Sequence, residues 1–304
     1  MKKTWQGLSA MVLACTIWGL SPIYYKALAH VPPGELLAHR TLWSLAIFAG
    51  LLLFQGRISA LPKAMASQRA LLIIAFAALM ISSNWGVFIW SVQAGRVTET
   101  SLGYYMFPLF SVLLGVTVLR ERLSGVQWLA IALATLGVVQ LTVGVGAAPW
   151  LSLFLGFTFG LYGLVKKQLS TGPVVSVTAE VFLLAPIAAV WLIWVHASGE
   201  GQFGGELVTT VMLAVSGLIT ALPLILFSFA AHRVNLATLG LMQYINPTLQ
   251  FFCATVVFGE ALTVYHIIAF SAIWIALALY SATAMAQDKA RRKSAMTSST
   301  EPPV

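Results

Sequence analysis

The sequence predicts an all-α polytopic membrane protein with ten transmembrane helices, arranged as two inverted five-helix repeats. Three observations support this prediction: the composition, ten apolar runs of spanning length, and a motif that occurs twice. Of the 304 residues, 59% are hydrophobic and only 9% are charged, whereas an ordinary soluble domain has roughly 25% charged residues. A soluble protein of this length needs far more polar surface, so the solvent around most of this chain is lipid.

The apolar runs define the predicted helices, because a helix that spans a bilayer needs roughly 20 mostly apolar residues. They lie at residues 7–28, 35–55, 70–93, 99–119, 125–143, 149–168, 175–196, 207–229, 236–258 and 263–285. Pro, Gly and polar residues separate them. Ser124 with Gln127 predicts a capping box at the start of the fifth run, and Thr263 predicts an N-cap at the start of the tenth.

One motif occurs twice. It consists of a polar turn, then an apolar run interrupted by proline, and then a turn that contains glutamate. Its first part repeats at an offset of 137 residues, from Arg96 to Arg233, and its last part at 139 residues, from Glu121 to Glu260. We therefore predict one five-helix repeat at 1–143 and a second at 149–285. The remaining residues, 286–304, are predicted to form a disordered cytoplasmic tail.

The basic residues predict the orientation, because cytoplasmic loops retain Lys and Arg. With the N-terminus inside, all but three of the 17 basic residues lie on the inner side; the exceptions are Lys26, Arg40 and Arg96. Both termini are therefore predicted to be cytoplasmic. The net charge of +8 is spread over alternate loops, so it indicates topology and attraction to anionic lipid rather than nucleic-acid binding.

Five helices in each repeat is an odd number, so the second repeat enters the membrane upside down relative to the first. Two inverted halves around a midplane site can adopt inward-open and outward-open states, and this architecture is typical of secondary transporters.

Several sequence motifs then suggest a family. They are Ile17 to Pro22, His39-Arg40 with Trp43-Ser44, Asn84-Trp85 with Phe88 to Trp90, Ser101 to Tyr104, Tyr162 to Val165, Thr238 to Gly240 and Gln243 to Leu249. This set resembles the EamA-type drug/metabolite transporters and, within them, the RarD-type chloramphenicol-sensitivity proteins. The resemblance implies ten helices, cytoplasmic termini, a small-molecule carrier role and a central cavity. One departure is Phe107, which stands where the RarD-type pattern has Asn.

Polar and aromatic side chains at membrane depth are the candidates for the wall of that cavity. Buried amides must find partners in the bundle interior, and aromatic rings with polar atoms suit amphipathic solutes. The candidate substrate-binding residues are Trp18, Asn84, Trp85, Tyr104, Tyr162, Gln243, Tyr244 and Asn246. Interhelical packing bonds and interfacial aromatic belts use the same residue types, so both remain alternatives.

Two prolines and two glutamates recur in the repeat. Pro108 and Pro247 are predicted to lie within helices, where each removes a backbone donor and can act as a hinge for alternating access. Glu121 and Glu260 precede helix N-termini, whose free N–H groups favour a carboxylate. We interpret the two glutamates as structural clamps of their turns, with a coupling role as the alternative.

Ionisable residues inside predicted helices are the candidates for proton coupling. Glu180, one turn into the run at 175–196, is the first candidate. Arg40 lies near the outer end of its helix, so we expect an interface anchor or a structural pair with Glu35. A proton relay through Glu35 and His39 is the alternative.

We therefore predict a secondary transporter of the inner membrane that exports small metabolites or xenobiotics by alternating access. The alternative is a membrane sensor that binds a small molecule without moving it. An enzyme is not expected, since Asp288 is the only Asp and no metal-ligand or nucleotide-binding motif occurs. The expected partners are a small-molecule substrate and the lipid bilayer, with no cofactor or metal, in a monomer or homodimer.

Overall fold

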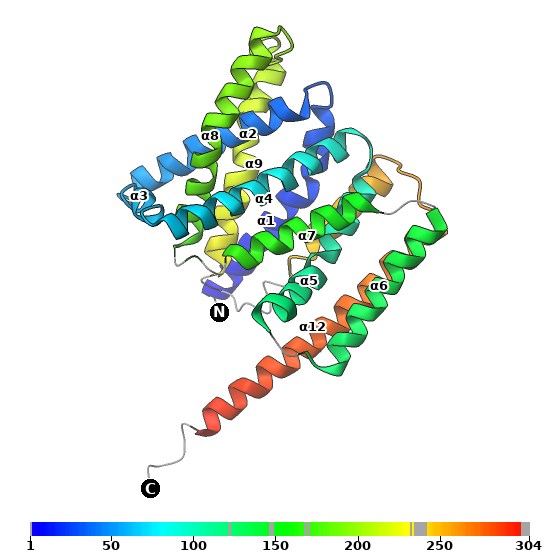
Figure 1. The fold of residues 1–304 in the computed structure, drawn as a ribbon. Coiled ribbons are helices and arrows are strands. Elements are labelled where there is room, and N and C mark those ends of the chain that lie inside the picture. Colours follow the sequence, from blue (N-terminus) through cyan, green and yellow to red (C-terminus); the bar gives the residue numbers. More distant parts are fainter. Residues whose placement is uncertain are drawn as a thin grey trace. The chain divides into compact units, whose positions relative to one another are not determined.

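All regular elements in the described part of the chain are helices, as the computed structural model shows (Figure 1). The structure describes residues 2–120, 123–145, 149–166, 169, 171–231, 233 and 242–298. The helices are α1 Lys2–Ala27, α2 Pro33–Phe54, α3 Ala60–Ala64, α4 Gln68–Gln93, α5 Val97–Leu119, α6 Gly125–Val145, α7 Trp150–Lys166, α8 Pro173–Ala197, α9 Leu207–Ala231, α11 Ile245–Phe252 and α12 Val264–Ser298, with a π-helical segment η1 at Cys253–Val257.

Eight of the described helices are long and apolar enough to cross a membrane: α1, α2, α4, α5, α6, α8, α9 and α12. The 17-residue α7 and the apolar segment Ile245–Val257 are shorter. The predicted run at 236–258 begins outside the described residues. The all-helical fold class is confirmed for the described residues, whereas the count of ten spans and the inversion of the two halves stay predictions.

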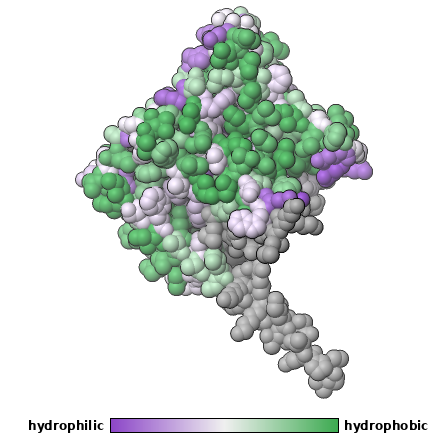
Figure 2. Space-filling view, turned by 180° about the vertical axis from the view of Figure 1, so that it is seen from behind, coloured by the Kyte–Doolittle hydropathy of each residue, from purple (hydrophilic) through white to green (hydrophobic). Residues whose placement is uncertain are grey.

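The helices present apolar side chains outward. On α8, Ile187, Val190 and Trp194 are 68%, 66% and 56% exposed, and their spacing places them on one stripe of the helix. Figure 2 shows hydrophobic residues over most of one face of the molecule. Contiguous apolar surface of this extent is incompatible with water as the solvent, so the chain is a multi-pass membrane protein.

The helices form two compact units that differ from the predicted repeats. One unit contains residues 1–111 and 150–261, and the other contains residues 112–149 and 262–304. Each predicted repeat therefore contributes to both units. In the larger unit, α2 packs against α8 and α9, α1 against α9 and α11, and α4 against α7.

The smaller unit is built on the packing of α6 against α12 (Figure 1). A Cβ atom at Gly137 would lie 3.0 Å from the Ala272 Cβ, and one at Gly144 would lie 2.1 Å from the Tyr265 ring. Between membrane helices, close packing of this kind replaces the hydrophobic effect, because lipid tails are as apolar as the side chains. The two glycines thus permit the approach of the two helices.

Two glycines also permit the close contact of α5 with α7. Gly103 lies where α5 meets α7, and a Cβ atom there would be 2.8 Å from the backbone oxygen of Ser152. Gly156 faces it, with a built Cβ atom 2.8 Å from the backbone oxygen of Gly103. Any side chain at either position would force the two backbones apart.

The predicted caps of α6 and α12 are confirmed. Gln127 accepts a hydrogen bond from the backbone N–H of Ser124 at 2.8 Å, and the Ser124 hydroxyl accepts one from the N–H of Gln127 at 3.4 Å. At α12, the hydroxyl of Thr263 accepts from the N–H of His266 at 3.4 Å. Both caps join residues three apart, so the local sequence contains both partners.

Glu260 is a clamp, but at a different helix from the one expected. Its carboxylate accepts hydrogen bonds from the backbone N–H groups of Val97, at 2.6 Å, and Thr98, at 2.7 Å. It also accepts from the Thr98 hydroxyl at 2.7 Å. The prediction of a clamp on the following helix is wrong, because the chain fold brings the free N-terminus of α5 within reach instead. Glu121 lies outside the described residues.

The last helix is longer than predicted. α12 continues to Ser298, so the segment expected to be a disordered tail, 286–304, is helical through that residue; residues 299–304 lie outside the described part. The reason is composition, because the extension is rich in Ala, Lys, Arg, Gln and Met, which are strong helix formers.

Candidate functional site

A chain of aromatic rings crosses the interior of the larger unit. It runs from Tyr25 on α1 to Phe88 on α4, Tyr104 on α5, and Phe159 and Tyr162 on α7. The successive ring centroids are 5.8, 5.7, 5.8 and 6.0 Å apart. The first three contacts are edge-to-face, which is the geometry that aromatic quadrupoles favour. We call these five residues the aromatic row.

Asn84 fixes the middle of the aromatic row. Its amide nitrogen donates to the backbone oxygen of Leu155 at 2.9 Å and to the Thr158 hydroxyl at 2.8 Å. Its amide oxygen accepts from the Tyr104 hydroxyl at 3.0 Å. The side chain is fully buried, and these bonds join α4 to α5 and α7. Asn84 therefore orients Tyr104. These bonds between helices are of the packing kind that the sequence predicts as the alternative to substrate binding by Asn84.

Arg40 lies at the Tyr25 end of the row. Its guanidinium donates to the Thr220 hydroxyl at 2.6 Å and to the Tyr25 hydroxyl at 2.7 Å, and its central carbon lies 4.0 Å from the Trp85 ring centroid. The residue is only 4% exposed. The expected pair with Glu35 is wrong, and Arg40 is a buried group rather than an exposed anchor.

Glu35 points instead to the loop before α9. Its carboxylate accepts hydrogen bonds from the backbone N–H groups of Gln202, at 2.9 and 3.1 Å, and Phe203, at 3.1 Å. His39 stacks on the Phe203 ring with centroids 4.5 Å apart, and its Nε2 lies 3.8 Å from the Glu35 Oε1. The acid thus ties the loop to the start of α2, because unpaired backbone donors in a loop attract a buried carboxylate.

Glu180 and Lys166 form an ion pair at the other end of the aromatic row. The Glu180 carboxylate also accepts from the Tyr162 hydroxyl at 3.1 Å and from the Ser176 hydroxyl at 3.1 Å. Glu180 is 1% exposed. The lysine and the two hydroxyl groups thus supply the buried carboxylate with partners; its role in proton coupling stays a prediction.

The other predicted substrate residues lie where α11 meets α1. The Asn246 side chain accepts from the Gln250 amide at 3.0 Å, and its backbone oxygen lies 3.0 Å from the Cβ position of Gly19. Trp18, next to that glycine, has its ring 6.5 Å from the Phe227 ring. Gln243 and Tyr244 immediately precede α11 and are partly buried. The predicted residues therefore divide into two groups.

The two predicted hinges differ in position. Pro108 lies inside α5, as expected. Pro247 lies in α11 as its third residue, because α11 begins at Ile245, and its role as a hinge stays a prediction. In a first turn the missing N–H of proline has little cost. The Pro247 carbonyl accepts a hydrogen bond from the Ser101 hydroxyl at 2.8 Å.

Sequence reasoning missed several members of this arrangement: Tyr25, Phe88, Phe159, Lys166 and Thr220. Lys166 was counted only as a topological charge, although a lysine and a glutamate near the facing ends of consecutive helices are a signal for a pair. The phenylalanines and Thr220 carry no such signal, since apolar and small residues are ordinary in membrane helices.

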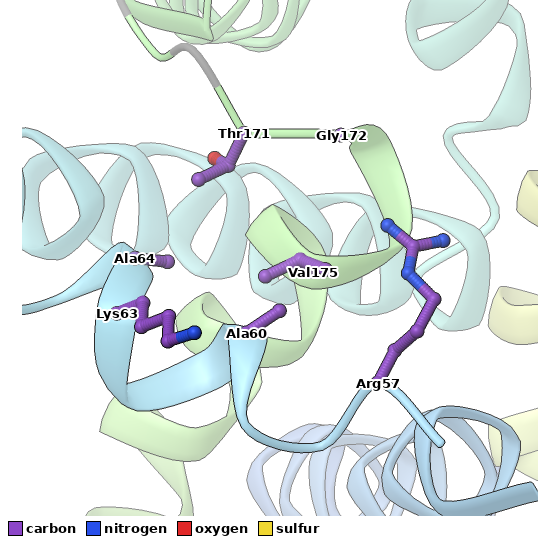
Figure 3. Close-up of a pocket in the computed structure, with 7 residues that line it drawn as sticks. All are labelled: Arg57, Ala60, Lys63, Ala64, Thr171, Gly172 and Val175. Carbon is purple, nitrogen blue, oxygen red and sulfur yellow. The ribbon is translucent and has the colours of Figure 1, made fainter. Parts of the chain in front are cut away.

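A separate pocket of about 280 Å³ lies between α3 and the start of α8 (Figure 3). Arg57 and Lys63 line it on one side, with Thr171 and Gly172 on the other. Neither basic residue belongs to the aromatic row. They are among the Lys and Arg residues that are predicted to lie on the cytoplasmic side.

Comparisons with known proteins give the family. The sequence model of the EamA-like transporter family matches residues 5–143. Protein RarD of Streptomyces exfoliatus is 42% identical over 264 residues, covering 86% of this chain and 84% of that protein. The chain is a RarD-type member of the EamA-like transporter family. Protein RarD of Escherichia coli is 35% identical, with coverage of 92% and 95%.

Other relatives carry the name of transporter without a substrate. An uncharacterised transporter of Pseudomonas aeruginosa is 41% identical over 277 residues, covering 90% of this chain and 91% of that protein. One solved crystal structure aligns with a TM-score of 0.60 over 92% of this RarD-type chain and 96% of its own, at 16% identity. That likeness concerns the fold alone.

Proposed function

We propose that this chain is a secondary transporter that exports small metabolites or xenobiotics across the inner membrane by alternating access. The observation that supports this most is the aromatic row, with Arg40 at one end and the Lys166–Glu180 pair at the other. Charged groups within membrane helices carry a cost and mark substrate or ion pathways. The names of the relatives point to transport in the same way.

The energy source we propose is a gradient or exchange. The sequence contains no phosphate-binding loop of the Gly-x-x-x-x-Gly-Lys-Ser/Thr kind, so nucleotide hydrolysis by this chain itself is not part of the proposal. Pro108 is the proposed hinge within α5, and Glu180, Glu35 and His39 are the proposed coupling groups. Trp18, Gln243, Tyr244 and Asn246 at the contact of α11 with α1 are a second proposed substrate surface.

Flux measurements test the proposal. The purified chain is reconstituted into liposomes, exposed to amino acids, purines, sugars and chloramphenicol, and assayed for trapped solute with and without a pH gradient. We expect one solute class to accumulate above protein-free vesicles. Tyr104→Ala and Tyr162→Ala should each lower that rate at least tenfold, whereas Trp128→Ala, on α6 and 49% exposed, should leave it unchanged. Binding without flux by folded protein would instead identify a sensor.

We also propose that the C-terminus is cytoplasmic and that the loop between α8 and α9 is on the outer side, and a labelling experiment tests this orientation. A variant without Cys15 and Cys253 receives one new thiol by Glu200→Cys or by Asp288→Cys. A membrane-impermeant maleimide added to intact cells should label the first and not the second. The opposite pattern would place the C-terminus outside.

A further inference from the structure

The partners of Arg40 are all neutral. A guanidinium keeps its positive charge at any physiological pH, yet its two hydrogen bonds go to the hydroxyls of Thr220 and Tyr25. The third contact is the face of Trp85. Among the described residues, no carboxylate lies within ion-pair distance of Arg40.

Two other basic residues of this unit have carboxylate partners. Lys166 faces Glu180, and Arg96 faces Glu99. Glu35, five residues before Arg40 on the same helix, accepts hydrogen bonds from backbone N–H groups of the loop. A buried charge in a membrane helix is normally paired, so the positive charge of Arg40 calls for an anion that the described chain does not supply.

The donor arrangement indicates which anion fits. A guanidinium has five N–H groups in a planar fork, and the bonds to Thr220 and Tyr25 use one on Nε and one on a terminal nitrogen. N–H groups on both terminal nitrogens remain. Two parallel donors of this kind match the two oxygens of a carboxylate, while the rings of Trp85 and Tyr25 provide apolar surface beside it.

We infer that Arg40 binds the carboxylate of the transported solute, and that the preferred solute is a small organic acid with an aromatic body. The aromatic row begins at Tyr25, whose hydroxyl is bonded to Arg40, and its rings are of the kind against which an aromatic body packs. Tyr25 and Thr220 hold the guanidinium in position. This inference rests on the proposed transport function and specifies its substrate class.

Matched pairs of solutes test the charge requirement. The purified protein in lipid nanodiscs is titrated with benzoate and benzamide, and with phenylacetate and phenylacetamide, with tryptophan fluorescence and calorimetry as readouts. Each acid should bind at least tenfold more tightly than its amide. Equal affinity for acid and amide, or no binding of either acid, would overturn the inference without any variant.

Variants of Arg40 test the residue. Arg40→Gln should weaken benzoate binding at least 100-fold and leave benzamide unchanged, and Arg40→Lys should retain part of the preference because it keeps the charge but not the fork. Arg57→Gln, a matched change at an exposed arginine of the pocket in Figure 3, should bind like the parent. Unchanged benzoate binding by folded Arg40→Gln would refute the anion site and mean that Arg40 only stabilises the packing of the helices.

Binding and flux separate the two proposals. Arg40-dependent benzoate binding without benzoate uptake into proteoliposomes would support the anion site and refute transport of that acid. Uptake of neutral solutes at parental rates by Arg40→Gln, with no acid preference in the parent, would support transport and refute the anion site. If Arg40→Gln does not fold, Tyr25→Phe replaces it, and the acid preference should then fall about tenfold.

Discussion

The Lys166–Glu180 pair allows a quantitative test of how this fold is held together. It joins α7 to α8, and the two side chains are 21% and 2% exposed. Breaking a buried ion pair by removing one partner costs about 3–5 kcal/mol. Because water reaches part of Lys166, we expect Lys166→Met to lower the free energy of unfolding by about 2–3 kcal/mol.

The second single variant should cost less. Glu180→Gln keeps the volume and the acceptor oxygen for Tyr162, and it leaves the partly exposed lysine to water, so a loss of about 1–2 kcal/mol follows. The double variant leaves no unpaired charge and should lie within about 1 kcal/mol of the parent, because apolar replacement of a buried pair is often neutral. The resulting coupling energy is about 3–4 kcal/mol.

Reversible unfolding by SDS titration in mixed micelles, followed by helical circular dichroism, measures these values. Lys63→Met at an exposed position is the control and should change the stability by less than about 0.5 kcal/mol. Additive single losses, with a coupling energy below about 0.5 kcal/mol, would refute the view that the pair is a buried unit.

Three further predictions use the same unfolding assay. Glu260→Ala removes a carboxylate that accepts three hydrogen bonds at the start of α5 and should cost about 2–4 kcal/mol; a loss no greater than that of Glu200→Ala in the loop between α8 and α9 would contradict the clamp. Gly103→Ala places a methyl group 2.8 Å from a backbone oxygen and should cost about 1–3 kcal/mol. The control Gly50→Ala, with open space around it, should be neutral or stabilise by up to about 1 kcal/mol. Equal effects of the two variants on stability would show that α5 and α7 do not meet at Gly103. Tyr104→Phe leaves the amide oxygen of Asn84 without its hydroxyl donor and should cost about 1–2 kcal/mol, and a stability equal to the parent's would mean that another donor replaces it.

The features that could be predicted from sequence are those whose partners are near in the chain. An apolar run in lipid must satisfy its own backbone, and a helix does so with bonds four residues apart. For that reason the long described helices largely lie in the predicted runs, whereas the five-residue α3 and the end of α12 lie outside them. The caps at Ser124 and Thr263 were predictable on the same grounds, since each pairs with a residue three positions away.

The site depended on residues that lie far apart in the chain. Glu260 meets Val97 across 163 positions, and Arg40 meets Thr220 across 180. Glu35 lies five residues from Arg40 on the same helix, yet in the fold its carboxylate binds the backbone of the loop at Gln202. A helix wheel shows which residues share a face, but it does not show which neighbouring helix that face will meet. The sequence by itself determined that this chain is helical and lies in lipid, because both follow from composition and local hydrogen bonding. Only the tertiary structure decided which of the described charges are paired and that the buried Arg40 is left with neutral partners, because that depends on which helices pack together.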